Sequence, residues 1–156
     1  SAGRLFEVLR LQRGYTYGAS SAFASTPETG YFHAASSVQG SSTKESVALF
    51  KEIINSFADD YTQEKLDGVK GAMLRANASA FETTSSLVSM LSAIRNYNLP
   101  DDFIAREEEV VSNMTLEDIK AKAAEYLNTD NMIIVVVGDA ATQLKNIPEA
   151  KLIDAI

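Results

Sequence analysis

The stretch Leu5–Tyr17 reads LFEVLRLQRGYTY and predicts a helix that turns directly into a strand. Three apolar side chains repeat at helical spacing on one face: Leu5, Val8 and Leu9. Gly14 permits the left-handed conformation that ends many helices. After Gly14 the period is two, which places on one face of a strand Tyr15, Tyr17, Ala19, Ser21 and Phe23. We therefore expect Arg10 of the helix and Tyr17 of the strand to meet at one corner.

The sequence after this corner predicts a β-hairpin and then a run of helices. Residues 15–25 and 31–39 are expected to be strands, because Pro27 and Gly30 between them suit a hairpin turn. Ser42 followed by Glu45 matches a capping box for the next helix. Four more helices are expected to begin near residue 62, before residue 87, at residue 101 or 102, and at residue 115.

Near the end of the chain, Met132–Val137 is apolar at every position, which predicts a buried strand. Gly138-Asp139 should then turn the chain into a short terminal helix. The order of elements predicts an α+β fold, in which an antiparallel or mixed sheet, made of the hairpin and this late strand, is covered by helices. The length of 156 residues predicts a single domain, residues 1–156.

The composition excludes several classes of function. A net charge of −7 argues against a nucleic-acid surface, and the absence of cysteine excludes thiolate metal sites and disulfides. The longest apolar run is too short to span a bilayer, so a soluble chain is expected. No signal peptide is expected from the N-terminal residues, and they do not indicate whether the compartment is, for example, the bacterial cytoplasm or the periplasm.

The segment LFEVLRLQRGYTYGASS resembles one in the non-catalytic domain of the pitrilysin/insulinase family of zinc metallopeptidases, which includes the mitochondrial processing peptidases. The family pattern is a Leu-Arg on a helix, a Gly, and a Tyr seven positions after the Arg. In this chain those positions are Arg10 and Tyr17. The resemblance continues through YFHAASSVQ, MTLEDIKAKAAEYL and MIIVVVGDA, and so covers roughly residues 4–145.

This resemblance implies a fold of the LuxS and processing-peptidase type. It also implies that the chain is the C-terminal part of a substrate-binding domain, N-terminally truncated and inactive alone. Arg10 and Tyr17 would bind the peptide substrate, while the zinc belongs to a catalytic domain or subunit elsewhere. The family zinc motif His-x-x-Glu-His cannot form here, since His33 is the single histidine. No cofactor is expected in this chain.

Alternatives remain open for each residue and for the function. Arg10 could pair with Glu7 on the helix surface, and Tyr15 shares the predicted strand face with Tyr17. By the same resemblance, the chain could be a structural or partner subunit without proteolysis, as in the core subunits of the respiratory cytochrome complex. An unrelated binding module would leave the pair unexplained. A three-stranded sheet would also leave an exposed edge, which predicts a homodimer of this chain.

Overall fold

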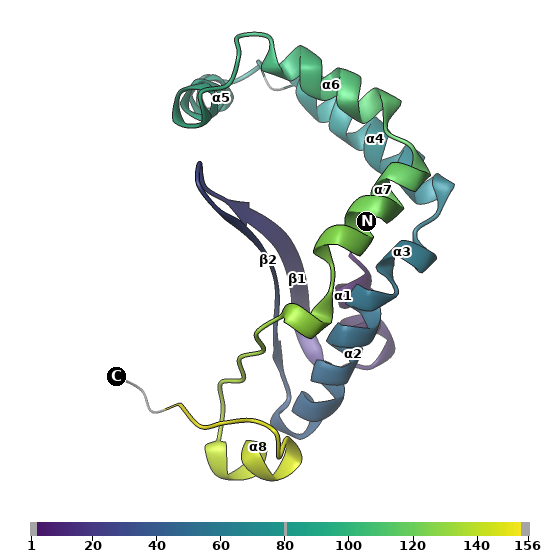
Figure 1. Cartoon of the computed structure of the whole chain (residues 1–156), viewed down its shortest axis with the longest axis vertical. Coiled ribbons are helices and arrows are strands. Elements are labelled where there is room, and N and C mark those ends of the chain that lie inside the picture. Colours follow the sequence, from purple (N-terminus) through teal and green to yellow (C-terminus); the bar gives the residue numbers. More distant parts are fainter. Residues whose placement is uncertain (1–2, 80, 154–156) are drawn as a thin grey trace. The chain divides into compact units, whose positions relative to one another are not determined.

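The computed structural model describes residues 3–79 and 81–153, which fold as two compact units. One unit comprises the chain up to Ala24, Phe32–Ser56, and the chain from Leu127 onward. The other comprises Ser25–Tyr31 and Phe57–Tyr126. The predicted α+β class is confirmed: helices accompany a sheet that, within the described residues, consists of two strands (Figure 1).

The N-terminal segment of the first unit begins as helix α1 (Arg4–Phe6) and continues as a wider π-helical turn, η1 (Glu7–Gln12). Gly14 has a φ of +68°, so the predicted left-handed end of this helix is confirmed. The predicted hairpin is also confirmed, with β1 at Thr16–Ser25 and β2 at Gly30–Val38. Its turn is closed by the Thr26 N–H, which donates to the Thr29 carbonyl at 2.7 Å.

Helix α2 (Thr43–Asn55) provides the other side of the core of this unit. Leu5, Leu9 and Ile53 are buried together, and the half-buried side chains packed on them include Tyr15 and Phe50. The capping box expected at Ser42 is wrong. A 3₁₀ turn, η2 (Gly40–Ser42), precedes the helix instead, and the buried Ser42 side chain makes no cap bond.

The late strand predicted at Met132–Val137 is also wrong. The segment runs between the 3₁₀ turn η3 (Thr129–Asn131) and helix α8 (Ala140–Asn146), and Figure 1 draws it as irregular chain. A strand needs a hydrogen-bonded neighbour, and in the described residues β1 pairs only with β2. The segment therefore exposes apolar side chains that the prediction placed in the core: Ile133 is 91% exposed, Val135 72% and Val137 94%.

Both ends of this segment are nevertheless fixed within the first unit. The Thr129 hydroxyl and N–H donate to Asn55 Oδ1 at 3.0 and 3.3 Å. On the other side, Asp139 caps α8 by accepting from the Thr142 N–H at 2.9 Å, and the Gln143 side chain donates to the Gly40 carbonyl at 3.0 Å. The predicted turn into a short terminal helix at Gly138-Asp139 is therefore confirmed, although the strand predicted before it does not form.

The described residues of the second unit form the tip of the hairpin and five helices. These are α3 (Phe57–Asp60), α4 (Gln63–Ser79), α5 (Thr84–Tyr97), α6 (Phe103–Asn113) and α7 (Leu116–Tyr126). Its buried side chains include Leu66 and Val111. Lys70 Nζ, on α4, donates to the carbonyl of Met114 at the end of α6 at 2.9 Å, which links the two helices. No described helix of the chain has the length and apolar character required to cross a membrane.

Candidate functional site

The candidate site lies in the first unit, where η1 ends and β1 begins. Leu9 is fully buried, which fixes the inner face of the π-helical turn. The Arg13 N–H donates to the Val8 carbonyl at 3.0 Å, a bond one residue longer than in an α-helix. The Tyr15 N–H then donates to the Leu9 carbonyl at 2.9 Å. A π-helical turn is rare and often occurs at functional sites; here it contains Arg10.

The side chain of Arg10 is directed toward the start of β1. Its Nη1 donates to the Thr16 carbonyl at 3.3 Å, and its guanidinium carbon lies 4.8 Å from the centre of the Tyr17 ring. No ion pair joins it to Glu7 in the part of the chain that the structure describes, so the alternative partner is not used. The predicted meeting of Arg10 with Tyr17 is therefore observed as a cation–π contact.

Tyr15 and Tyr17 occupy different environments, although both were expected on one strand face. Tyr15 is half-buried and packs against the core cluster of the first unit. Tyr17 is 89% exposed and lies under the Arg10 guanidinium. The geometry thus separates a packing tyrosine from one whose hydroxyl can reach a ligand.

Thr16, between the two tyrosines, was not among the site residues predicted from the sequence. It is buried, and its hydroxyl lies 2.7 Å from the Ser37 carbonyl and 2.8 Å from the Gly18 carbonyl, either of which it can donate to. The same hydroxyl accepts from the Gly18 N–H and the Ser36 hydroxyl. Its carbonyl holds Arg10, so Thr16 joins the site to the hairpin. The feature of the sequence that could have indicated this role is the hydroxyl residue between the two tyrosines, which a strand places on the opposite face from them.

The site offers hydrogen-bond donors rather than acids or bases. A guanidinium has five N–H donors, and in the described structure the Thr16 carbonyl takes one of them. The phenol of Tyr17 adds a hydroxyl at an exposed position. This combination suits carbonyl or carboxylate oxygens, such as those of an extended peptide backbone.

The residues of this chain do not fit a zinc site. His33 is exposed on β2 and is the single histidine of the sequence, whereas zinc needs three or four convergent ligands. Among residues 3–79 and 81–153, no three His, Cys, Asp or Glu side chains group as metal ligands would. Glu107 and Glu109 are exposed on α6, as expected for the solvated face of a helix.

Comparisons with known proteins bear on this geometry. Residues 1–73 match the model of a family described as the peptidase M16 inactive domain. The chain is also similar to the crystal structure of a peptidase M16 inactive domain from Pseudomonas fluorescens, with 25% sequence identity and a TM-score of 0.73. That similarity covers 81% of this chain and 30% of the other, so the chain spans less than a third of the length of its structural relative. No curated protein matches the chain.

The two matches agree with each other and with the fold. The family match contains the whole segment that carries Arg10 and Tyr17, and the structural match extends over most of the chain. The sequence match over residues 1–73 and the shared fold therefore both show that this chain is similar to the peptidase M16 domain described as inactive.

Proposed function

We propose that the chain is the substrate-binding portion of a zinc-dependent endopeptidase and is inactive alone. In this proposal it contributes Arg10 and Tyr17 to a site whose zinc is held by another domain or subunit. The single observation that carries the proposal is the contact of the Arg10 guanidinium with the exposed Tyr17 ring. The similarity to a peptidase domain described as inactive supports a role in binding rather than in bond cleavage.

The proposed role of each side chain follows from its donors. Arg10 is half-buried and held by the Thr16 carbonyl, so its guanidinium is oriented before a peptide arrives. It would donate to backbone carbonyls of an extended peptide, and the Tyr17 hydroxyl would donate to a neighbouring carbonyl. Positioning of this kind lowers the entropic cost of reaction, even though the bond-breaking groups lie elsewhere.

Photo-cross-linking in the complete peptidase tests this proposal. The probe is an extended peptide with a diazirine side chain next to the cleaved bond, and a chelator stops its hydrolysis. We expect the label in the tryptic fragment 14–44, which contains Tyr17, and we expect competition by unlabelled peptide. Arg10→Ala should greatly reduce the label. Absence of label from this fragment would contradict the proposal and favour a structural or partner subunit instead.

A further inference from the structure

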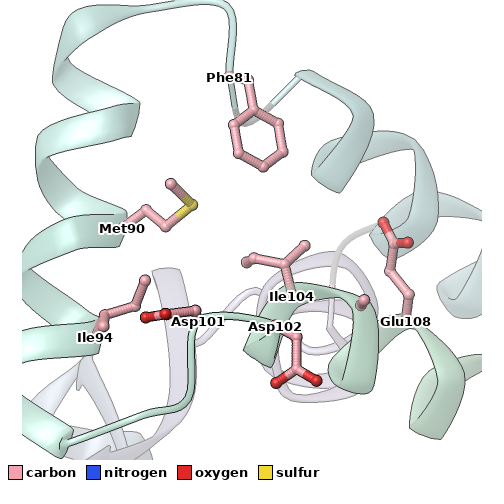
Figure 2. Close-up of a pocket in the computed structure, with 8 residues that line it drawn as sticks. Phe81, Met90, Ile94, Asp101, Asp102, Ile104 and Glu108 are labelled. Carbon is pink, nitrogen blue, oxygen red and sulfur yellow. The ribbon is translucent and has the colours of Figure 1, made fainter.

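A pocket of about 340 Å³ lies in the second unit, on helices α5 and α6 and the turns that precede each of them. Its apolar wall comes from four side chains: Phe81, Met90, Ile94 and Ile104. Phe81, Met90 and Ile104 point into the same space (Figure 2). Phe81 is 53% exposed, so these apolar groups are only partly covered by the chain itself. The volume is at the lower end of the range of about 300–1,000 Å³ that is common for ligand sites.

Carboxylates lie at the rim of this pocket. Asp101 and Glu108 both line it, whereas the Asp102 side chain points away and pairs with Arg106 at 2.7 Å. Among the described residues that line the pocket, none is basic. The chain as a whole carries a net charge of −7, which adds to a negative potential at this rim.

From this combination we propose that the pocket binds a peptide segment in which an apolar side chain is flanked by Lys or Arg. The apolar side chain would cover the partly exposed wall formed by Phe81, Met90 and Ile104, and its removal from water would supply most of the affinity. The flanking cations would lie against Asp101 and Glu108 and would select the charge of the peptide. This second binding site is independent of the roles proposed for Arg10 and Tyr17.

Fluorescence anisotropy with the 156-residue chain tests the proposal. The probe is the fluorescein-labelled peptide Gly-Ser-Arg-Leu-Arg-Ser-Gly, compared with one peptide in which Ser replaces Leu and another in which Glu replaces both Arg. We expect the first peptide to bind. The peptide that lacks Leu should bind at least about tenfold more weakly, because it loses the apolar side chain that the pocket would cover. The peptide with Glu in place of both Arg should bind at least about threefold more weakly, in line with partly exposed charge pairs. Added salt should weaken the binding of the first peptide.

Matched variants on α6 locate the binding. Glu108→Gln should weaken binding of the probe peptide about threefold. Glu109→Gln changes an exposed neighbour outside the pocket and should leave that binding unchanged. Ile104→Ala should weaken binding of the probe peptide about fourfold, the change in affinity that corresponds to burying one methylene group fewer. Val110→Ala, at an exposed position, should leave the affinity unchanged. Circular dichroism checks that each variant is folded.

Three results would overturn the proposal. The first is no binding of the probe, and the second is equal binding of the peptide that lacks Leu. The third is equal weakening by the pocket variants and their controls. The contrast between Glu108→Gln and Glu109→Gln reports on this pocket alone, whereas the label in fragment 14–44 reports on the proposed function, so failure of one can be distinguished from failure of the other.

Discussion

The guanidinium carbon of Arg10 lies 4.8 Å from the centre of the Tyr17 ring, although the two residues belong to different elements. Arg10 comes from the π-helical turn η1, and Tyr17 is the second residue of β1. The buried Leu9 fixes η1 on the core of the first unit, and the Thr16 hydroxyl bonds the start of β1 to the Ser37 carbonyl of β2. The contact thus depends on the core of the first unit, whereas the Tyr17 ring itself faces solvent.

Tyr17→Phe should leave the stability of the chain unchanged within about 0.5 kcal/mol, because the side chain is 89% exposed and Phe keeps the ring under Arg10. Urea unfolding followed by circular dichroism measures the free energy. As a comparison, Tyr15→Ala removes a ring packed on the core and should cost about 2 kcal/mol. A larger loss for Tyr17→Phe than for Tyr15→Ala would show that the two tyrosines have been assigned the wrong roles.

Gly14→Ala should destabilise the chain by about 1–2 kcal/mol, because the φ of +68° is costly for a residue with a Cβ atom. Gly18→Ala is the matched control. Its φ is not positive, and an added Cβ there would meet no described heavy atom within 4 Å. Thermal unfolding of both variants provides the measurement, and equal midpoints would refute the structural role given to Gly14.

Thr115→Ala should raise the pKa of Asp118. In the native chain the Thr115 hydroxyl, and then its N–H, donate to the Asp118 carboxylate at 2.7 and 2.9 Å, which lowers that pKa. Because the folded pKa is lowered, the bond stabilises the fold above the unfolded value of about 4. That stabilisation is lost as the pH falls through the lowered pKa.

An NMR titration of the side-chain carboxyls measures this change. Asp139 is the internal control, because Thr142 lowers its pKa in the same way at a different helix. Its pKa should be unaffected by Thr115→Ala. If the pKa of Asp118 also stayed constant, the hydroxyl bond would not be the cause of the shift.

The exposed segment Met132–Val137 predicts self-association of the chain as it stands. Its apolar side chains face solvent, and a segment outside the described β1-β2 sheet can pair with a second copy by two-fold symmetry. Light scattering should show a mass that rises with concentration. Val135→Lys should suppress the rise, whereas Leu152→Lys, also at an exposed apolar position, should not. A native chain that stays monomeric at every concentration would contradict this prediction.

Features governed by neighbouring residues could be predicted from the sequence. The left-handed Gly14, the turn of the hairpin at Thr26 and Thr29, and the caps at Thr115 and Asp139 each depend on a few consecutive residues. The capping box at Ser42 failed because a 3₁₀ turn was equally compatible with Gly40-Ser41-Ser42 and buried the serine. Local signals thus predict an element better than they predict the exact geometry of its end.

Features that depend on distant partners could not be predicted in the same way. Met132–Val137 has the composition of a buried strand, but composition does not supply the neighbour that would pair with it. For the site, the spacing of Arg10 and Tyr17 predicted that the two would meet, because a turn at Gly14 brings them together. The role of the Thr16 carbonyl required the path of the backbone through the π-helical turn, which no sequence period indicates.

The central claim is that Arg10 and Tyr17 bind the substrate of a peptidase, and steady-state kinetics of the complete enzyme test it most directly. Loss of one donor to the reacting peptide typically costs roughly 10²–10³ in rate, so Arg10→Ala and Tyr17→Phe should each lower kcat/KM by about that factor. Tyr15→Phe should remain close to the native value, since that ring packs in the core. Native kcat/KM in both Arg10→Ala and Tyr17→Phe, or an equal loss in Tyr15→Phe, would contradict the claim.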